Sequence, residues 1–105
     1  MTKQLSDLGR FSDPSLVILT CLADGPKHGY AMITEGERLG VNLGLGTLYG
    51  ALNRLERMGL IEALPPQNRR RPYRITPTGV DFLKHHLECL SRIIEVSTEK
   101  LGVTA

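Results

Sequence analysis

The side chains best suited to a chemical task gather in the segment TLYGALNRLERM, at positions 47–58. Wound at about 100° per residue, this segment places its apolar residues on one side and its polar residues on the other. The apolar side holds Leu48, Ala51, Leu52, Leu55 and Met58, and the polar side holds Tyr49, Gly50, Asn53, Arg54 and Arg57. Asparagine can pair with adenine, arginine with guanine or phosphate, and tyrosine with phosphate, so the polar side suits DNA.

Three consecutive arginines, Arg69, Arg70 and Arg71, follow the turn-forming stretch Pro65-Pro66-Gln67-Asn68. From Thr47 to Thr76 there are six basic residues and two acidic ones, whereas the rest of the chain has seven basic and nine acidic residues. The net charge of +2 is too small to indicate a partner. The clustering of positive charge in one segment is nevertheless typical of a surface that binds an anion. Taken alone, a polar helix face or a basic loop is often merely solvated.

Proline and glycine divide the 105 residues into elements that position these side chains. Asp13-Pro14 predicts the start of a helix through SLVILTCLAD, and a second helix is expected over HGYAMITEGERLG. The segment at 47–58 is the third helix, and glycines at positions 25, 40 and 59 end the three helices. The first twelve residues add a short helix through Leu5, Leu8 and Phe11.

After the third helix the pattern predicts a hairpin and then one long helix. Strands are expected at 60–64 and 69–75, the second at a sheet edge because Pro72 lacks an amide donor. Thr76-Pro77 then opens a helix that runs to about Leu101. The fold class is mainly α with a small β-hairpin. Residues 1–76 form a winged helix-turn-helix region, with 1–13 as an N-terminal extension, and 77–105 form a dimerisation helix within the same compact unit.

Three segments resemble the PadR-type transcriptional regulators: GPKHGYAM, LGLGTLYGALNRLERMGLIE and RRRPYRITPTG. The resemblance spans about residues 16–90 and fits the smaller size class of that family. It implies DNA contacts from Thr47, Tyr49 and Asn53 and from the arginines at 69–71.

The resemblance also bears on the start of the second helix. There Lys27 and His28 are expected at phosphate, with a helix-capping role for His28 as the alternative, and Tyr30 is expected in the core. The ring of Tyr73 is expected to pack under the wing. Gly50 and Gly44 replace the family's usual proline and serine, and the absence of tryptophan puts stacking of flat ligands in doubt.

The last helix carries an apolar seam at steps of three and four residues, which is typical of a helix that pairs with another helix. The seam comprises Val80, Leu83, Leu87, Leu90, Ile94 and Leu101. A second stripe beside it comprises Phe82, His86, Cys89, Ile93 and Val96. One stripe can cover the domain while the other meets a second copy, so we expect a homodimer. A wide core face in a monomer is the alternative.

Other functions find little support in the sequence. No apolar run reaches the roughly 18–20 residues of a membrane span, and the start lacks a signal-peptide pattern, so a cytoplasmic protein without a membrane partner is expected. Cys21 and Cys89 are expected to be reduced and buried. His85, His86 and Cys89 lack the further ligands that a metal site needs, and no cofactor or catalytic motif is recognised.

The sequence therefore predicts a dimeric, sequence-specific DNA-binding regulator. Repression at a roughly palindromic operator, with release by a small apolar effector, is the expected mode of action. A winged-helix protein-interaction module is the main alternative, and a small-molecule sensor that acts by partner binding is a third.

Overall fold

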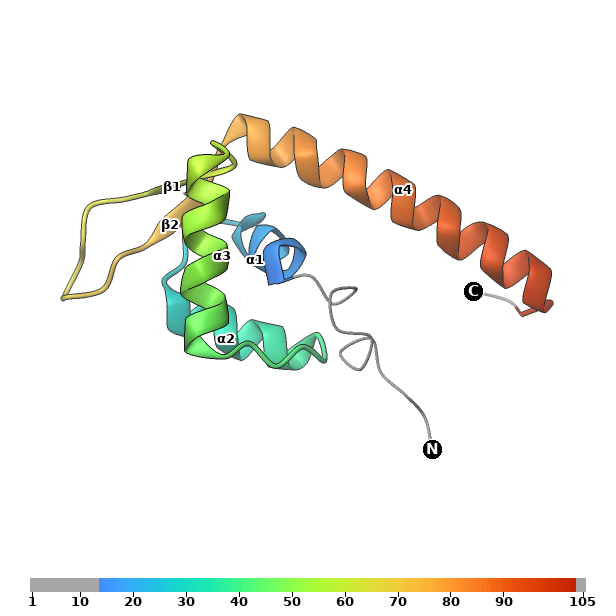
Figure 1. The fold of residues 1–105 in the computed structure, drawn as a ribbon, viewed down its shortest axis with the longest axis horizontal. Coiled ribbons are helices and arrows are strands. Elements are labelled where there is room, and N and C mark those ends of the chain that lie inside the picture. The colour runs from blue at the N-terminus through green and yellow to red at the C-terminus, as the bar shows by residue number, and fades with distance from the viewer. Residues whose placement is uncertain (1–13, 104–105) are drawn as a thin grey trace.

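The computed structural model describes residues 14–103, which form four helices and a two-stranded antiparallel hairpin (Figure 1). The elements, in chain order, are α1 (Pro14–Leu22), α2 (Gly29–Arg38), α3 (Leu45–Arg57), β1 (Ile61–Ala63), β2 (Tyr73–Ile75) and α4 (Pro77–Leu101). The order and the fold class are as predicted. Asp13 and the short helix expected through Leu5, Leu8 and Phe11 lie outside the described residues.

The core forms around α1, which contacts α2, α3, α4 and β2. Five of its nine residues are buried: Val17, Ile18, Leu19, Cys21 and Leu22. The helix α3 adds Leu48, Ala51, Leu52 and Leu55 to this core, as its periodicity predicted. Met58 was expected beside them but is 54% exposed, because α3 ends at Arg57 and the chain turns at Gly59. The buried face of α3 leaves its opposite face open.

The hairpin is shorter in its strands and longer in its loop than predicted. Ile61 pairs with Ile75, and Ala63 with Tyr73. Arg69, Arg70 and Arg71 were expected in the second strand but precede it. The loop closes in a two-residue turn in which Asn68 and Arg69 both have positive φ, at 50° and 67°. Gln67 and Arg70 exchange backbone hydrogen bonds of 2.7 and 2.8 Å across this turn, as in hairpins that match the twist of their strands.

The junction between hairpin and α4 leaves no room for a side chain at Gly79. Thr76 caps α4 by accepting a hydrogen bond from the Gly79 amide at 3.0 Å, and its hydroxyl donates to the Gly59 carbonyl at 2.7 Å. A Cβ atom at Gly79 would lie 2.0 Å from the Leu60 carbonyl oxygen. The predicted cap at Thr76-Pro77 is confirmed, and it binds the start of α4 tightly to the end of α3.

The seam predicted on α4 divides between two environments. Leu83 is only 7% exposed and belongs to the chain's own core, so it is not free to meet a second copy, whereas Val80 is half-buried. The burial of Leu83 corrects its assignment to the dimer interface, and the assignment of Val80 stays a prediction. The remaining seam residues lie on the half of α4 that projects beyond the rest of the described chain (Figure 1). Leu87, Ile94 and Leu101 are 49%, 58% and 75% exposed.

The two cysteines differ in environment, although both were expected to be buried. Cys21 is fully buried, whereas Cys89 is exposed because it lies on the projecting half of α4. Both are free thiols. Burial, with a smaller effect from Glu35, raises the pKa of the Cys21 thiol to about 12.

We therefore expect a thiol-specific reagent to modify Cys89 and to leave Cys21 untouched at neutral pH, because only a thiolate reacts. Reagent uptake should be one equivalent in the native protein and two after unfolding. Cys89→Ser should abolish the native reaction. Fast native labelling of that variant would contradict the buried, protonated state of Cys21.

Candidate nucleic-acid interface

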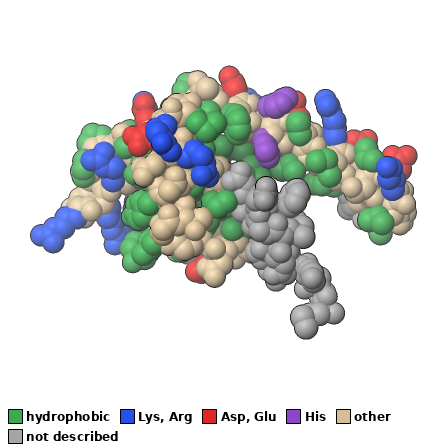
Figure 2. All heavy atoms as spheres, viewed as in Figure 1, with side chains coloured by type: hydrophobic (Ala, Val, Ile, Leu, Met, Phe, Trp, Pro, Cys, Tyr) green, Lys and Arg blue, Asp and Glu red, His purple; other side chains and the backbone are tan. Residues whose placement is uncertain are grey.

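The open face of α3 and the loop of the hairpin, which we call the wing (residues 64–72), form one side of the molecule. Figure 2 shows lysine and arginine side chains gathered over the hairpin and the adjoining end of α3. The exposed polar side chains on α3 include Thr47, Tyr49, Asn53 and Arg57. A Cβ atom at Gly50 would meet nothing within 4 Å, so this face is flat and open at its centre.

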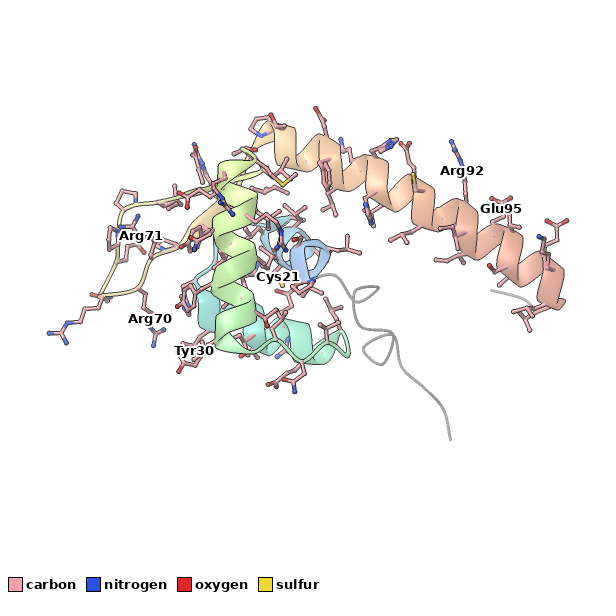
Figure 3. The ribbon with its side chains drawn as sticks, in the orientation of Figure 1. Cys21, Tyr30, Arg70, Arg71, Arg92 and Glu95 are labelled. Atoms are coloured by element: carbon pink, nitrogen blue, oxygen red, sulfur yellow. The ribbon has the colours of Figure 1, made fainter. Side chains whose placement is uncertain are left out.

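A hollow of about 290 Å³ joins α2, α3 and the wing. Its lining residues are His28, Gly29, Tyr30, Tyr49, Arg69, Arg70, Arg71 and Tyr73. Figure 3 shows Arg70 reaching from the wing toward the side of the molecule where Tyr30 lies. Phenol hydroxyls and guanidinium groups from three elements therefore converge, as recognition of a phosphate backbone requires.

Tyr30 was expected in the core, and the structure corrects this because its side chain is 67% exposed. It lies in the first turn of α2, which packs directly on α3. A Cβ atom at Gly29 would lie 3.1 Å from Leu48 and 3.5 Å from the Tyr49 hydroxyl. The glycine lets the two helices approach closely, and the following tyrosine is thereby turned outward.

Tyr73 holds the base of the wing, as predicted. It is 8% exposed, and its burial, with a smaller effect from Glu56, raises the pKa of its hydroxyl. Its backbone also exchanges hydrogen bonds of 3.1 and 2.9 Å with Lys27. The segment before α2 thus pairs with β2 on the side opposite β1. The sequence does not predict this bridge, because a single residue pair leaves no periodic pattern.

The positive charges of the wing arginines are not neutralised by ion pairs with described carboxylates. In the described part of the chain the ion pairs are Lys27–Asp24 and Arg74–Glu62, so no described carboxylate pairs with the arginines at 69–71. Arg70 instead places Nη1 3.3 Å from Nε2 of His28. Unpaired cations beside each other raise the local potential and favour an anion.

Lys27 and His28 lie at the start of α2 as expected, but they do different things. The Lys27 ammonium bonds to the Cys21 carbonyl at 2.5 Å and to the Asp24 carboxylate, whose pKa it lowers. The Lys27 ammonium is thus engaged within the chain, whereas the expected contact with phosphate stays a prediction. His28 occupies the N-cap position, but its side chain makes no capping bond and lines the hollow instead.

The two arginines of α3 are also separated. Arg57 stays on the open face, beside Asn53 and Glu56. Arg54 turns toward the opposite side, where its Nη2 donates to the Ser15 hydroxyl at 3.0 Å and its side chain lines an apolar cavity against α4. Arg54 therefore does not share the open face of α3 with Asn53 and Arg57, because its guanidinium bonds to Ser15 on α1.

A metal site and a membrane-spanning helix both have requirements that the described residues do not meet. Histidine, cysteine and carboxylate side chains at positions 14–103 form no group of three or more that could hold a metal ion, and His85 Nε2 lies 4.0 Å from Cys89 Sγ. Over the same range, no helix has the length and apolar character needed to cross a membrane.

Comparisons with known proteins agree with this geometry. Residues 18–85 match the transcriptional regulator PadR-like family. The chain is 37% identical over 90 residues to the transcriptional regulator Rv3488 of Mycobacterium tuberculosis, a match that covers 83% of this chain and 81% of that protein. It is 41% identical over 85 residues to an uncharacterized 37.1 kDa protein in transposon TN4556 of Streptomyces fradiae, covering 80% of this chain and 25% of that protein.

A solved structure gives the same result for the fold. A PadR family transcription regulator from Clostridium difficile R20291 superposes with a TM-score of 0.77 at 26% identity, covering 84% of this chain and 97% of that one. The three motifs that carried the resemblance lie entirely inside the matched residues. The chain belongs to the PadR-like family of transcriptional regulators.

Proposed function

We propose that this protein is a dimeric, sequence-specific DNA-binding repressor. The observation that carries the proposal is the convergence of the open face of α3, the two exposed tyrosines and the unpaired arginines of the wing on one side of the molecule. This side of the molecule has a flat helix face with cationic groups at its margin. This combination fits a helix in the major groove and a wing over the neighbouring phosphates.

Within this arrangement the roles of the side chains differ. Asn53 and Thr47 lie exposed on α3, where they can reach base edges in the groove. Tyr30, Tyr49 and Arg70 surround the hollow, where they bind backbone phosphates and fix the register of the helix. Gly50 lets the DNA backbone or a base edge approach α3 without a side chain between them.

The projecting half of α4 supports the dimer. Its exposed apolar side chains lack cover within the described chain, and Figure 2 shows them along that half of the helix. The wing and this half of α4 extend in opposite directions (Figure 1). Two copies joined through α4 therefore carry their α3 helices on the outer sides of the pair. Two such helices meet successive major grooves about 34 Å apart on a roughly palindromic site. A dimer bound over a promoter excludes the transcription machinery, and a small apolar effector that alters the α4 contact releases it.

The proposal is tested by fluorescence anisotropy on the DNA upstream of the protein's own gene, beside a scrambled duplex of equal composition. We expect tighter binding to the first duplex. Asn53→Ala should weaken that preference by about tenfold, since a bidentate base contact contributes about 1–3 kcal/mol. Arg70→Ala should weaken binding to both duplexes and lower the salt slope by about 1.

Arg92→Ala is the matched control, because Arg92 is a cation that points away from the body of the molecule on the projecting half of α4 (Figure 3). It should bind both duplexes as the unsubstituted protein does. Equal binding to both duplexes, unchanged in Asn53→Ala, would contradict sequence reading. No binding at low salt would favour the protein-interaction module instead.

A further inference from the structure

The imidazole of His28 contacts the turn of the wing, although the residue belongs to the start of α2. Its Nε2 atom lies 3.3 Å from Nη1 of Arg70, a residue 42 positions further along the chain. Both side chains line the hollow of about 290 Å³ beside α3. Both also line a second hollow of about 450 Å³, which Gln67, Asn68 and Pro72 complete. The contact therefore lies at the border of two hollows, where the wing faces α2.

The chemistry of the two groups fixes the direction of this hydrogen bond. A guanidinium has only donors, so Nε2 of His28 must accept the hydrogen bond from Arg70. In a neutral imidazole whose Nε2 accepts, the proton lies on Nδ1. Nδ1 of His28 is buried and has no hydrogen-bond partner among the described residues. The contact with Arg70 thus leaves a buried donor unsatisfied.

This arrangement does not serve the stability of the fold. His28 occupies the N-cap position of α2 without making a capping bond, whereas a serine or asparagine there would normally make one. A buried donor that lacks an acceptor also lowers the free energy of unfolding. A side chain that disfavours stability yet contacts a wing arginine indicates a role in function, since local rules are broken most often at functional sites.

The backbone around His28 is held well enough to fix the ring. Its carbonyl accepts hydrogen bonds from the amides of Ala31 at 3.1 Å and Met32 at 3.3 Å. Lys27, directly before it, exchanges backbone hydrogen bonds with Tyr73 at the base of the wing. Two consecutive residues therefore contact the wing, Lys27 at its base through the backbone and His28 at its turn through the side chain.

Arg70 is the wing residue that gains from this support. It is exposed and directly follows the two-residue turn, and it forms no ion pair with a described carboxylate (Figure 3). A long side chain that is already ordered before binding loses less conformational entropy when it meets its partner. The bond to His28 therefore favours the binding of an anion by Arg70.

We propose that His28 is a positioning residue for DNA binding, whose Nε2 atom holds the guanidinium of Arg70 beside α3, where a backbone phosphate meets it. The inference rests on the proposed function, because it names the residue that orders one of the phosphate contacts. His28 acts through Arg70 and needs no contact of its own with DNA. This role differs from the direct phosphate contact expected from the sequence.

The test compares His28→Ser with His28→Gln by anisotropy on the upstream duplex and its scrambled counterpart. Serine caps a helix well but is too short to reach Arg70, so His28→Ser should keep or raise the urea midpoint. It should nevertheless weaken binding to both duplexes about three- to tenfold, which corresponds to ordering one long side chain. His28→Gln restores an acceptor oxygen and should recover most of the affinity. Loss of stability and affinity together in His28→Ser would indicate a merely structural residue and overturn the proposal.

A double-mutant cycle with Arg70→Ala shows whether His28 acts through the guanidinium. In the Arg70→Ala background, His28→Ser should cause no further loss of affinity. An undiminished loss there would overturn the proposal and assign His28 a phosphate contact of its own. His85→Ser is the matched control, because His85 is exposed on α4 outside both apolar stripes, and it should change neither affinity nor midpoint.

The ring nitrogens of His28 give a readout that needs no DNA. Long-range ¹H–¹⁵N NMR spectra distinguish a protonated ring nitrogen from an unprotonated one, and we expect the proton of the neutral ring on Nδ1. A proton on Nε2 would overturn the proposal. Sequence-specific binding that His28→Ser leaves unchanged would overturn this inference alone. Equal binding to both duplexes that depends on His28 and Arg70 would support it and contradict sequence reading.

Discussion

Gly79→Ala is expected to destabilise the fold by about 3 kcal/mol or more. The added Cβ atom would lie 2.0 Å from the Leu60 carbonyl oxygen and 2.7 Å from a side-chain carbon of Ile75. Neither neighbour can move away easily, because the contact at Leu60 is a backbone carbonyl and Ile75 belongs to the hairpin. The start of α4 must therefore move away and break the Thr76 cap. Urea denaturation measures the effect as a lower midpoint at unchanged slope.

Gly50→Ala is the matched control for this substitution. Gly50 also lies within a helix, but a Cβ atom there meets open space. Replacement of a helical glycine by alanine should raise stability by about 0.5–1 kcal/mol, because the unfolded chain loses conformational freedom. Similar midpoints for the two variants would show that the contact at Gly79 does not constrain the fold.

Ile94→Glu is expected to convert the dimer that we propose to a monomer and to weaken specific DNA binding by at least about 100-fold. The reason is that a linked second binding event raises overall affinity by about 10²–10⁴ without any new contact. Ile94 is 58% exposed on the projecting half of α4, so glutamate costs the monomer little and helix propensity is kept. Sedimentation velocity and anisotropy on the upstream duplex measure the two effects.

Ser91→Glu places the same carboxylate three residues earlier, outside both apolar stripes of α4. It should sediment as a dimer and keep its affinity for DNA. If Ile94→Glu stays dimeric, or if Ser91→Glu also dissociates, the apolar stripe is not the contact between copies.

Much of the fold was predictable because its signals are local. Pro77 after Thr76 marks the start of α4 and Gly102 follows its end, and the structure places the helix at those bounds. The periodicity of α3 likewise separated its buried face from its open one. Caps, glycines and apolar spacing act within a few residues, so a sequence displays them directly.

The errors concern side chains whose placement depends on distant partners. Tyr30 is exposed because Gly29 packs on Leu48, which lies nineteen positions further along the chain. Arg54 turns away from the open face of α3 because its guanidinium bonds to the Ser15 hydroxyl beside α4. Arg69 was assigned to a strand, whereas the turn places it at positive φ, a conformation that arginine rarely adopts. Helical angle alone could not reveal these contacts.

The backbone bridge between Lys27 and Tyr73 has a mechanical consequence. Together with β1 it clamps β2 from both edges, so the wing cannot swing without breaking hydrogen bonds to two separate parts of the chain. The base of the wing is therefore joined to β1 on one edge and to the segment before α2 on the other. In the dimer that we propose, control would then change the distance between the two DNA-binding regions and leave the internal arrangement of each one unchanged.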